Sequence, residues 1–238
     1  RAVEMGMFAD PPHPPRDLVD AAVAHYEAEG DDYSPGPWLR QEATAEERAE
    51  LRMEATTMAT TLAESFPPLK ARWKPRVESP LTVRVITDVI TLSARPDLML
   101  GVPEGTTAKT LVVDFKTGRP AAAHLDDARF YALLVTLRTG VPPFRSASFY
   151  LDSGDWTAVD VTEDDLASAA RRTVAGTVAL AELAAGGRAP AATAGPMCRF
   201  CVIRDTCDVG LEAARQREAQ AGDDGIDGDA NFGSGPPF

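Results

Sequence analysis

Two short stretches decide the fold of this chain: Arg95-Pro96-Asp97-Leu98-Met99-Leu100-Gly101 and Thr110-Leu111-Val112-Val113-Asp114-Phe115-Lys116-Thr117-Gly118. Each contains a short apolar run, in the second case rich in β-branched residues, that ends at a turn residue, and this pattern predicts two strands. If residues 102–109 close a symmetric antiparallel hairpin between them, Asp97 lies directly opposite Asp114. The two stretches therefore predict a pair of facing acids.

This register brings two carboxylates and one ammonium group together. Because side chains alternate along a strand, Lys116 lies on the same face as Asp114, and Phe115 points to the other side. Like charges placed directly opposite each other are destabilising, so we expect a cation between them. Divalent cations such as Mg²⁺ prefer carboxylate oxygens and keep bound water. The pattern favours a site for phosphodiester hydrolysis; the alternative is a turn residue after Pro96 and a polar pair at a strand end.

The surrounding sequence predicts one α/β or α+β domain. We expect helices at 17–29, 45–65, 126–139 and 162–185, and strands at 81–86, 89–93, 97–100, 110–116, 146–151 and 156–161. Thr44 and Glu47 form a capping-box signature, and residues 31–40 are expected to be a loop. We expect four segments: a Pro-rich segment with a short helix (1–43), the α/β core (44–195), a Cys-rich metal- or cluster-binding segment (196–210) and an acidic disordered tail (211–238).

Composition limits the class of protein. The chain has 238 residues, of which 44% are hydrophobic and 25% charged, as in ordinary globular proteins. It contains no apolar run long enough for a membrane-spanning helix. Its net charge of −12 gives no indication of a basic nucleic-acid-binding surface. The chain opens at Arg1 without an initiator Met or signal pattern, so we expect its true start to lie upstream. Three cysteines packed into one short segment favour a reducing cytoplasm and a metal.

The pair Pro96-Asp97, followed by Asp114-Phe115-Lys116, resembles the PD-(D/E)XK nuclease superfamily. The stretch 113–118 is similar to its RecB-like branch, which includes CRISPR-associated iron–sulfur nucleases, and the resemblance runs over about 44–208. It implies a restriction-endonuclease-like central mixed sheet flanked by helices. Asp97, Asp114 and the Phe115 carbonyl would hold Mg²⁺ or Mn²⁺, and Lys116 would act on water and phosphate. The implied partners are DNA with single-stranded character and a helicase or defence-system protein.

The chain departs from the RecB-like pattern at two places. The branch continues with a Gln-x-x-x-Tyr helix, and here Asp127 replaces the Gln while Tyr131 matches. Tyr131 would steady the substrate, with simple helix packing as the alternative, and Arg129 is a further candidate for substrate contact. The metal-binding His of the branch is absent from 44–65; the chain's histidines are His13, His25 and His124, the last expected near a helix cap. Glu50 or Glu54 could face the site instead, with a solvated acidic helix face as the alternative. A catalytically weak module that binds DNA or a partner protein is the rival interpretation.

Cys198, Cys201 and Cys207 have the spacing of thiolate clusters that bind Zn²⁺ or iron–sulfur centres. A redox pair or buried thiols are the alternatives. The resemblance implies a 4Fe–4S cluster in a C-terminal Cys-rich knot, with a fourth Cys upstream of the core that this sequence lacks. A zinc-binding interaction protein without nucleic acid is a third interpretation.

A basic segment precedes the predicted strands. Lys70, Arg72, Lys74 and Arg76 occupy every second position and would share one face if the segment were extended. Trp73 would then offer a stacking surface for an unpaired base beside the phosphate backbone. The alternative is a solvated edge segment.

Overall fold

The computed structural model describes residues 13–29, 34–66, 69–86, 89–194, 198, 201, 203, 206–212 and 215. The chain forms two compact units, residues 1–176 and 177–238. Every described strand belongs to the first unit. Residues 1–12 of the predicted Pro-rich segment and most of the predicted disordered tail, residues 216–238, lie outside the described residues.

Three N-terminal helices share a small core. They are α2 (Pro15–Ala28), α3 (Gly36–Gln41) and α4 (Ala45–Ser65). Helix α4 has the predicted bounds and the predicted capping box. In this box Glu47 N–H donates to Thr44 Oγ1 at 3.2 Å, and Thr44 N–H donates to Glu47 Oε2 at 2.7 Å. Helix α3 lies where a loop was expected; a proline in its first turn fits a helix start. The shared core is formed by Val19, Val23, Leu39 and Ala59.

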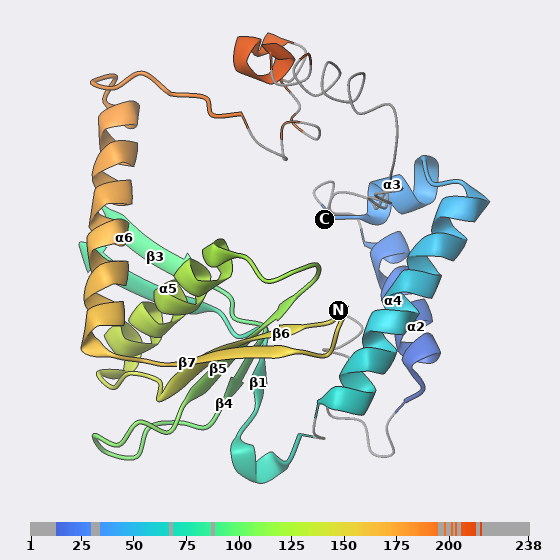
Figure 1. Ribbon diagram of the computed structural model, residues 1–238, viewed down its shortest axis with the longest axis horizontal. Helices are drawn as coiled ribbons and strands as arrows, with labels where there is room; N and C mark the ends of the chain where they lie inside the picture. Colours follow the sequence, from blue (N-terminus) through green and yellow to red (C-terminus); the bar gives the residue numbers. More distant parts are fainter. Residues whose placement is uncertain are drawn as a thin grey trace, which may run out of the picture. The chain divides into compact units, whose positions relative to one another are not determined.

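A five-stranded mixed sheet forms the centre of the first unit (Figure 1). Its order is β1-β4-β5-β6-β7, with β1 Arg76–Val77, β4 Leu98–Leu100, β5 Leu111–Lys116, β6 Arg145–Tyr150 and β7 Trp156–Asp160. Strands β5 and β6 are parallel, and the other neighbouring pairs are antiparallel. Because parallel strands need a crossover, the connection contains helix α5 (Ala122–Thr139), which begins four positions before the predicted start at Asp126. The expected mixed sheet flanked by helices is confirmed.

The two remaining strands form a separate hairpin. Strands β2 (Leu81–Ile86) and β3 (Ile90–Ala94) pair only with each other within the described residues. Leu81 of this hairpin joins Met99, Val112 and Leu134 in one buried cluster, which places the hairpin against α5. The sequence predicted both strands but did not separate them from the central sheet.

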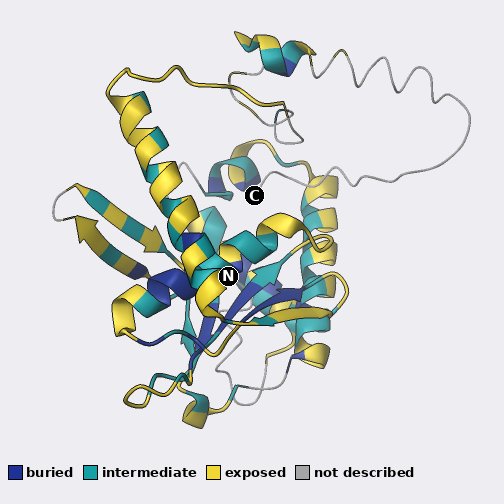
Figure 2. Cartoon of the chain, turned by 60° about the vertical axis from the view of Figure 1, so that its left-hand side comes forward, coloured by how far each residue is buried: buried dark blue, intermediate teal, exposed yellow. Residues whose placement is uncertain are grey.

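The middle strands of the central sheet, β4, β5 and β6, are largely buried and contain the dark blue segments of the sheet in Figure 2, whereas the edge strand β7 is mostly exposed. Val112 faces the cluster under α5, whereas Val113 faces a second cluster with Phe66, Leu98 and Phe149. The alternation of β5 thus divides its side chains between two different cores. Asp114 and Lys116 follow the parity of Val112 and point toward α5.

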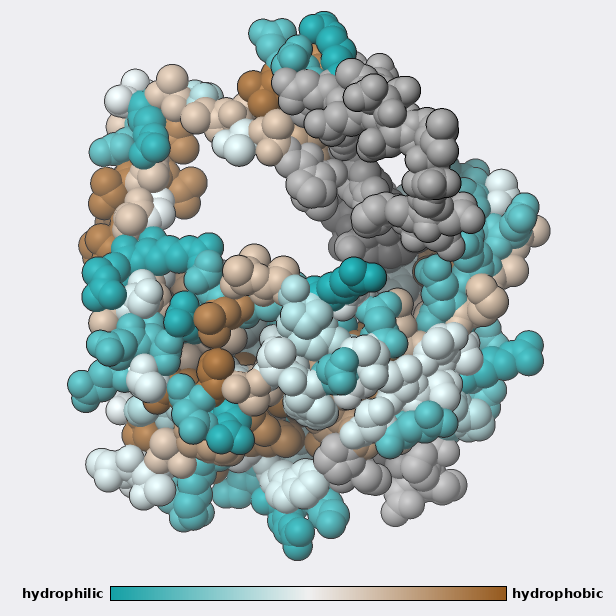
Figure 3. Space-filling view, in the orientation of Figure 1, coloured by the Kyte–Doolittle hydropathy of each residue, from teal (hydrophilic) through white to brown (hydrophobic). Residues whose placement is uncertain are grey.

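The last long helix, α6 (Glu163–Ala184), is exposed along most of its length. Thr162 and Asp165 cap it reciprocally, because Asp165 N–H donates to Thr162 Oγ1 and Thr162 N–H donates to Asp165 Oδ2, both at 3.2 Å. Three of its large apolar side chains, Val174, Val178 and Leu180, are exposed, and brown atoms lie along the left side of Figure 3, where α6 runs. No helix in the described part of the chain has both the length and the apolar character needed to cross a bilayer.

The basic segment at 70–76 is not extended, which corrects the expectation of a single-faced stripe. Residues Ala71–Trp73 form a 3₁₀ turn, η1, and Lys74 adopts a left-handed backbone with φ of 47°. The turn rotates successive side chains around its axis, so the basic groups do not alternate across a strand. Only Arg76 enters a strand, β1.

Candidate active site

The hairpin of β4 and β5 has the predicted register. Leu98 pairs with Val113, Met99 with Val112 and Leu100 with Leu111. Asp97, which directly precedes β4, therefore lies opposite Asp114 at the end of the ladder. The predicted register of the hairpin, which sets the two acids opposite each other, is confirmed.

Asp97 is fixed by the backbone of the neighbouring strand. Its Oδ2 accepts a hydrogen bond of 2.6 Å from the N–H of Phe115. Burial raises the pKa of Asp97 to about 6, and the nearby charges of Asp114 and Glu78 act in the same direction, while the hydrogen bond from Phe115 opposes them. The carboxyl group of Asp97 is thus held in place but resists losing its proton while no cation is near.

Asp114 is the most buried acid of the site, with 6% of the residue exposed. The Lys116 ammonium lies 2.7 Å from its Oδ2 as an ion-pair partner. No hydrogen bond of good geometry reaches this Oδ2 within the described residues. A buried carboxylate oxygen with lone pairs to spare is a suitable ligand for a hard cation.

Lys116 bridges two carboxylates. Its Nζ also donates to Oδ2 of Asp127 in α5, at 2.9 Å. Burial works to lower the pKa of Lys116, but the contacts with Asp114 and Asp127 outweigh it and raise the pKa overall. Asp127, which stands in the place of the Gln of the RecB-like pattern, therefore adds a second negative partner for the lysine.

Tyr131 lies on the same side of α5 as Asp127, one turn further along the helix. It packs against the cluster of Val112 and Leu134. Burial, followed by the charge of Asp114, raises the pKa of the Tyr131 phenol. The hydroxyl therefore stays protonated and serves as a donor beside Asp114.

Arg129, the further candidate for substrate contact, lies on another face of α5. Its Nε donates to Oδ1 of Asp165 at 2.8 Å, and its Nη1 lies 4.0 Å from Asp126. Two positions along a helix correspond to a rotation of roughly 200°, so Arg129 points away from the face of Asp127 and Tyr131. The structure gives Arg129 an ion pair with Asp165, next to the cap of α6, and its contact with substrate stays a prediction.

The other sequence candidates also have clear positions. Glu50 and Glu54 are exposed side chains of α4. His124 accepts a hydrogen bond from Ala121 N–H at 3.3 Å and lies 3.0 Å from the Tyr150 hydroxyl, in keeping with the expected cap position.

Glu78 was missed by the sequence analysis. Its N–H donates to the Asp97 carbonyl oxygen at 3.0 Å, and its charge contributes to the raised pKa of Asp97. The residue follows a two-residue strand, β1, and has a φ of 47°. Such a short strand leaves no periodic signal that could have placed Glu78 beside the site.

The donor set suits a divalent cation. Among the described residues, no three side chains of His, Cys, Asp or Glu form a group able to hold a metal. Asp97 and Asp114 nevertheless provide two facing carboxylates, and the buried Oδ2 of Asp114 has the Lys116 ammonium as its ion-pair partner but accepts no hydrogen bond from the described residues. Mg²⁺ commonly uses one or two protein carboxylates and keeps several waters, so two carboxylates fit it.

The three cysteines are free of disulfides. The N–H of Cys201 donates to the Cys198 carbonyl oxygen at 3.3 Å, and Cys207 precedes a short helical turn. In this part of the described chain the thiols do not form a three-ligand group. The described part of this segment therefore offers no observation in favour of a cluster or a zinc ion.

The mixed sheet flanked by helices defines a restriction-endonuclease-like fold, and two acids and a lysine lie together at the ends of two of its paired strands. The family model of the PD-(D/E)XK nuclease superfamily matches residues 8–208, and the chain belongs to this superfamily.

Two solved structures are similar to the chain. That of SSO0001 has a TM-score of 0.42 at 15% identity, over 88% of this chain and 93% of that one. That of an exonuclease candidate from Eubacterium rectale has a TM-score of 0.42 at 11% identity, over 81% of each chain. No curated protein sequence matches the chain.

Proposed function

We propose that this protein is a Mg²⁺- or Mn²⁺-dependent deoxyribonuclease of the RecB-like kind, acting on DNA with single-stranded character. The observation that carries the proposal is the buried carboxylate of Asp114, which faces Asp97 across the β4–β5 hairpin and contacts Lys116. These residue types in one place suit hydrolysis of a phosphodiester bond.

The proposed metal ligands are Asp97, Asp114 and the carbonyl group of Phe115. When bound, the ion would neutralise the carboxylates, polarise a phosphate oxygen and acidify a bound water. The Phe115 N–H orients Asp97 for this role through its 2.6 Å hydrogen bond. Phe115 would thus donate its N–H to Asp97 and offer its carbonyl oxygen to the metal, so one backbone residue would help to position both acids around the ion.

Lys116 is proposed to stabilise the charge that develops on the scissile phosphate. Its side chain is 20% exposed, so it can reach a ligand without a change in the strand. In the present arrangement its ammonium is shared between Asp114 and Asp127. A cation on Asp114 would weaken the first of these attractions and free the ammonium for phosphate. Tyr131 is proposed to position Asp114 and the substrate from α5.

A second candidate function is a catalytically weak module that binds DNA or a protein. The observation in its favour is the ion pair of Lys116 with Asp127, because a lysine held by two acids is less available to phosphate. The iron–sulfur or zinc site at Cys198, Cys201 and Cys207, and a helicase or defence-system partner, stay predictions from the resemblance.

The decisive experiment compares cleavage of linear and circular DNA, single- and double-stranded, in Mg²⁺, Mn²⁺ or EDTA, with RNA as a further substrate. We expect cleavage of single-stranded DNA that requires the metal and disappears in Asp114→Asn. DNA binding without cleavage in either metal would favour the weak module. Cleavage that persists in both EDTA and Asp114→Asn would reject the assigned site.

A further inference from the structure

A cavity of about 500 Å³ opens on the face of the sheet that is turned away from Asp114. Its floor contains Leu100 and Leu111, which form a pair across the β4–β5 hairpin. Leu111 packs with the cluster of Val113, whereas Asp114 follows the opposite parity of β5. The volume lies within the range of about 300–1,000 Å³ that is typical of ligand sites.

Aromatic rings line one part of this cavity. They belong to Phe66, Trp73, Phe144 and Trp156. Phe144 and Trp156 are 44% and 41% exposed, which is high for rings of this size beside a buried core. Trp156 and Phe66 have ring centroids 5.1 Å apart and form a continuous apolar wall. Two of the chain's three tryptophans therefore open onto one cavity.

Cationic side chains line another part. Arg72, Lys74 and Lys109 border the cavity with Glu104 as the acidic residue among its described lining. Lys109 pairs with Glu104 at 2.6 Å, and Lys70 lies over the Trp73 ring at 5.6 Å from its centroid. Two of the four lysines in the chain thus line this cavity and a third, Lys70, lies over one of its rings, in a protein with a net charge of −12. The local excess of positive charge calls for an anionic ligand.

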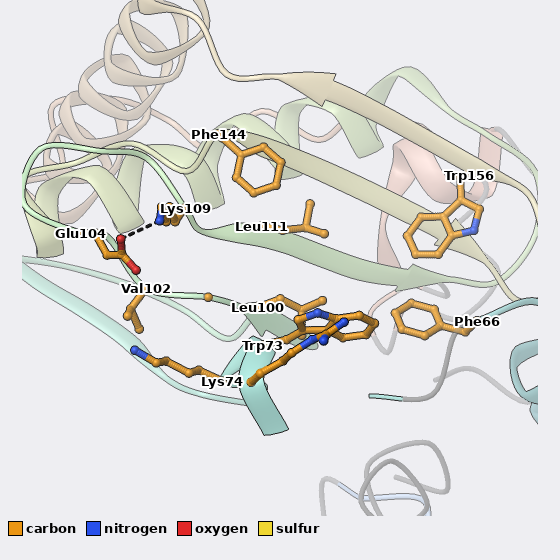
Figure 4. Close-up of a pocket in the computed structure, with 12 residues that line it drawn as sticks. Phe66, Trp73, Lys74, Leu100, Val102, Glu104, Lys109, Leu111, Phe144 and Trp156 are labelled. Carbon is orange, nitrogen blue, oxygen red and sulfur yellow. Dashed lines mark hydrogen bonds and ion pairs between the residues drawn. The ribbon is translucent and has the colours of Figure 1, made fainter. Parts of the chain in front are cut away.

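The Phe66 and Trp156 rings lie apart from the Lys74 and Lys109 ammonium groups (Figure 4). Figure 4 shows Phe66 and Trp156 at one end, Lys74 and Lys109 at the other, and Trp73 between them. A flat base with a phosphate attached has the same division between an apolar, stackable part and an anionic part. An acidic peptide would use the ammonium groups but would leave the flat aromatic surface without a matching partner.

We infer that this cavity binds an unpaired nucleotide of a DNA strand, with the base against the aromatic rings and a phosphate at Lys74 and Lys109. The inference rests on the proposed function and extends it to a second contact with the substrate strand. Because the cavity and the two acids lie on opposite faces of the sheet, the nucleotide bound here is not the one that is cleaved. Stacking on aromatic rings tolerates any base, so we expect weak sequence preference.

The test measures binding apart from cleavage. Anisotropy of fluorescein-labelled oligo(dT) is followed in EDTA with Asp114→Asn as the parent protein, into which Trp73→Ala or Lys74→Gln is introduced. The Trp73 carbonyl accepts a hydrogen bond from Gly101 N–H at 2.6 Å, and alanine keeps this contact. Arg84→Gln, an exposed cation on the separate β2–β3 hairpin, is the matched control for charge.

The two variants have different expected signatures. Trp73→Ala should weaken binding about tenfold without changing its salt dependence, because it removes stacking alone. Lys74→Gln should reduce the slope of log Kd against log salt by about 0.7, as for one lost phosphate contact with a single strand. Arg84→Gln should lower neither the affinity nor the slope, and dTMP should displace the strand only at far higher concentration.

Parent-like binding by Lys74→Gln and a folded Trp73→Ala overturns the inference. If Trp73→Ala does not fold, Lys74→Gln and Trp156→Phe decide the question. If the protein bound dTMP as tightly as oligo(dT), the inference would be overturned in favour of a site for a free nucleotide. If the cavity variants changed self-association and not DNA binding, it would be overturned in favour of a protein interface. Cleavage by the wild type with parent-like binding in the cavity variants would leave the proposed function standing, so the two failures are distinguishable.

Discussion

The backbone N–H of Phe115 donates a 2.6 Å hydrogen bond to Oδ2 of Asp97. The bond joins Asp97, the residue before β4, to Phe115 in the neighbouring strand β5. This bond extends the pairing of the two strands beyond the last β4 residue and turns the Asp97 carboxyl toward Asp114. One backbone donor therefore determines where the first acid of the site lies. The consequences are measurable in stability, pH dependence and cleavage.

Asp114→Asn should lower DNA cleavage at least about 100-fold, because it removes the buried charge that a metal requires. The fold should persist, since Asn has the same shape and its replacement relieves repulsion with Asp97. Initial cleavage rate and melting temperature should be measured on the same preparation. Activity within a few-fold of wild type would reject Asp114 as a ligand.

Asp97→Asn should change the pH dependence of stability in the metal-free protein. The pKa of Asp97 is raised from 3.8 to about 6 in the folded state, so the folded protein holds this proton more tightly than the unfolded chain. Its stabilising effect is present below about pH 4 and is lost as the pH rises to about 6. The free energy of unfolding of the variant, relative to wild type, should therefore increase over this interval, as measured by urea unfolding in EDTA. An unchanged difference would contradict the raised pKa.

Asp127→Gln should raise cleavage by a few-fold. The neutral amide can still accept a hydrogen bond from Lys116 but removes one of the two charges that hold its ammonium. The value of kcat/KM on single-stranded DNA is the appropriate measurement, with Asp126→Gln as a control one position away on α5. A loss of more than about 100-fold would instead make Asp127 a necessary part of the site.

Thr44→Ala should lower the free energy of unfolding by about 1 kcal/mol through loss of the cap of α4. For a chain of this size that corresponds to a fall of roughly 2–4 °C in melting temperature. Thr57→Ala, which removes an exposed hydroxyl bonded within the same helix, is the matched control and should change stability less. Equal effects of both substitutions would argue against the capping box as a separate source of stability.

The cysteine segment is tested by elemental analysis after anaerobic purification of the protein. The resemblance predicts iron and sulfide, with visible absorbance that is lost in Cys201→Ser. One equivalent of zinc without iron would favour a zinc site. Absence of both would leave Cys198, Cys201 and Cys207 as ordinary thiols.

The sequence by itself determined the β4–β5 hairpin, its register and the facing of Asp97 and Asp114, because these follow from strand alternation and a short connection. It also determined α4 and its cap, since Thr44 and Glu47 act within one turn. Tertiary structure decided the rest of the site. The contact of Lys116 with Asp127, the proximity of Glu78 to Asp97 and the pairing of Arg129 with Asp165 each join separate elements. The aromatic cavity likewise gathers Phe66, Trp73 and Trp156 from three parts of the chain. Local patterns fix the period and ends of an element, whereas the distance between two elements depends on how their buried side chains pack.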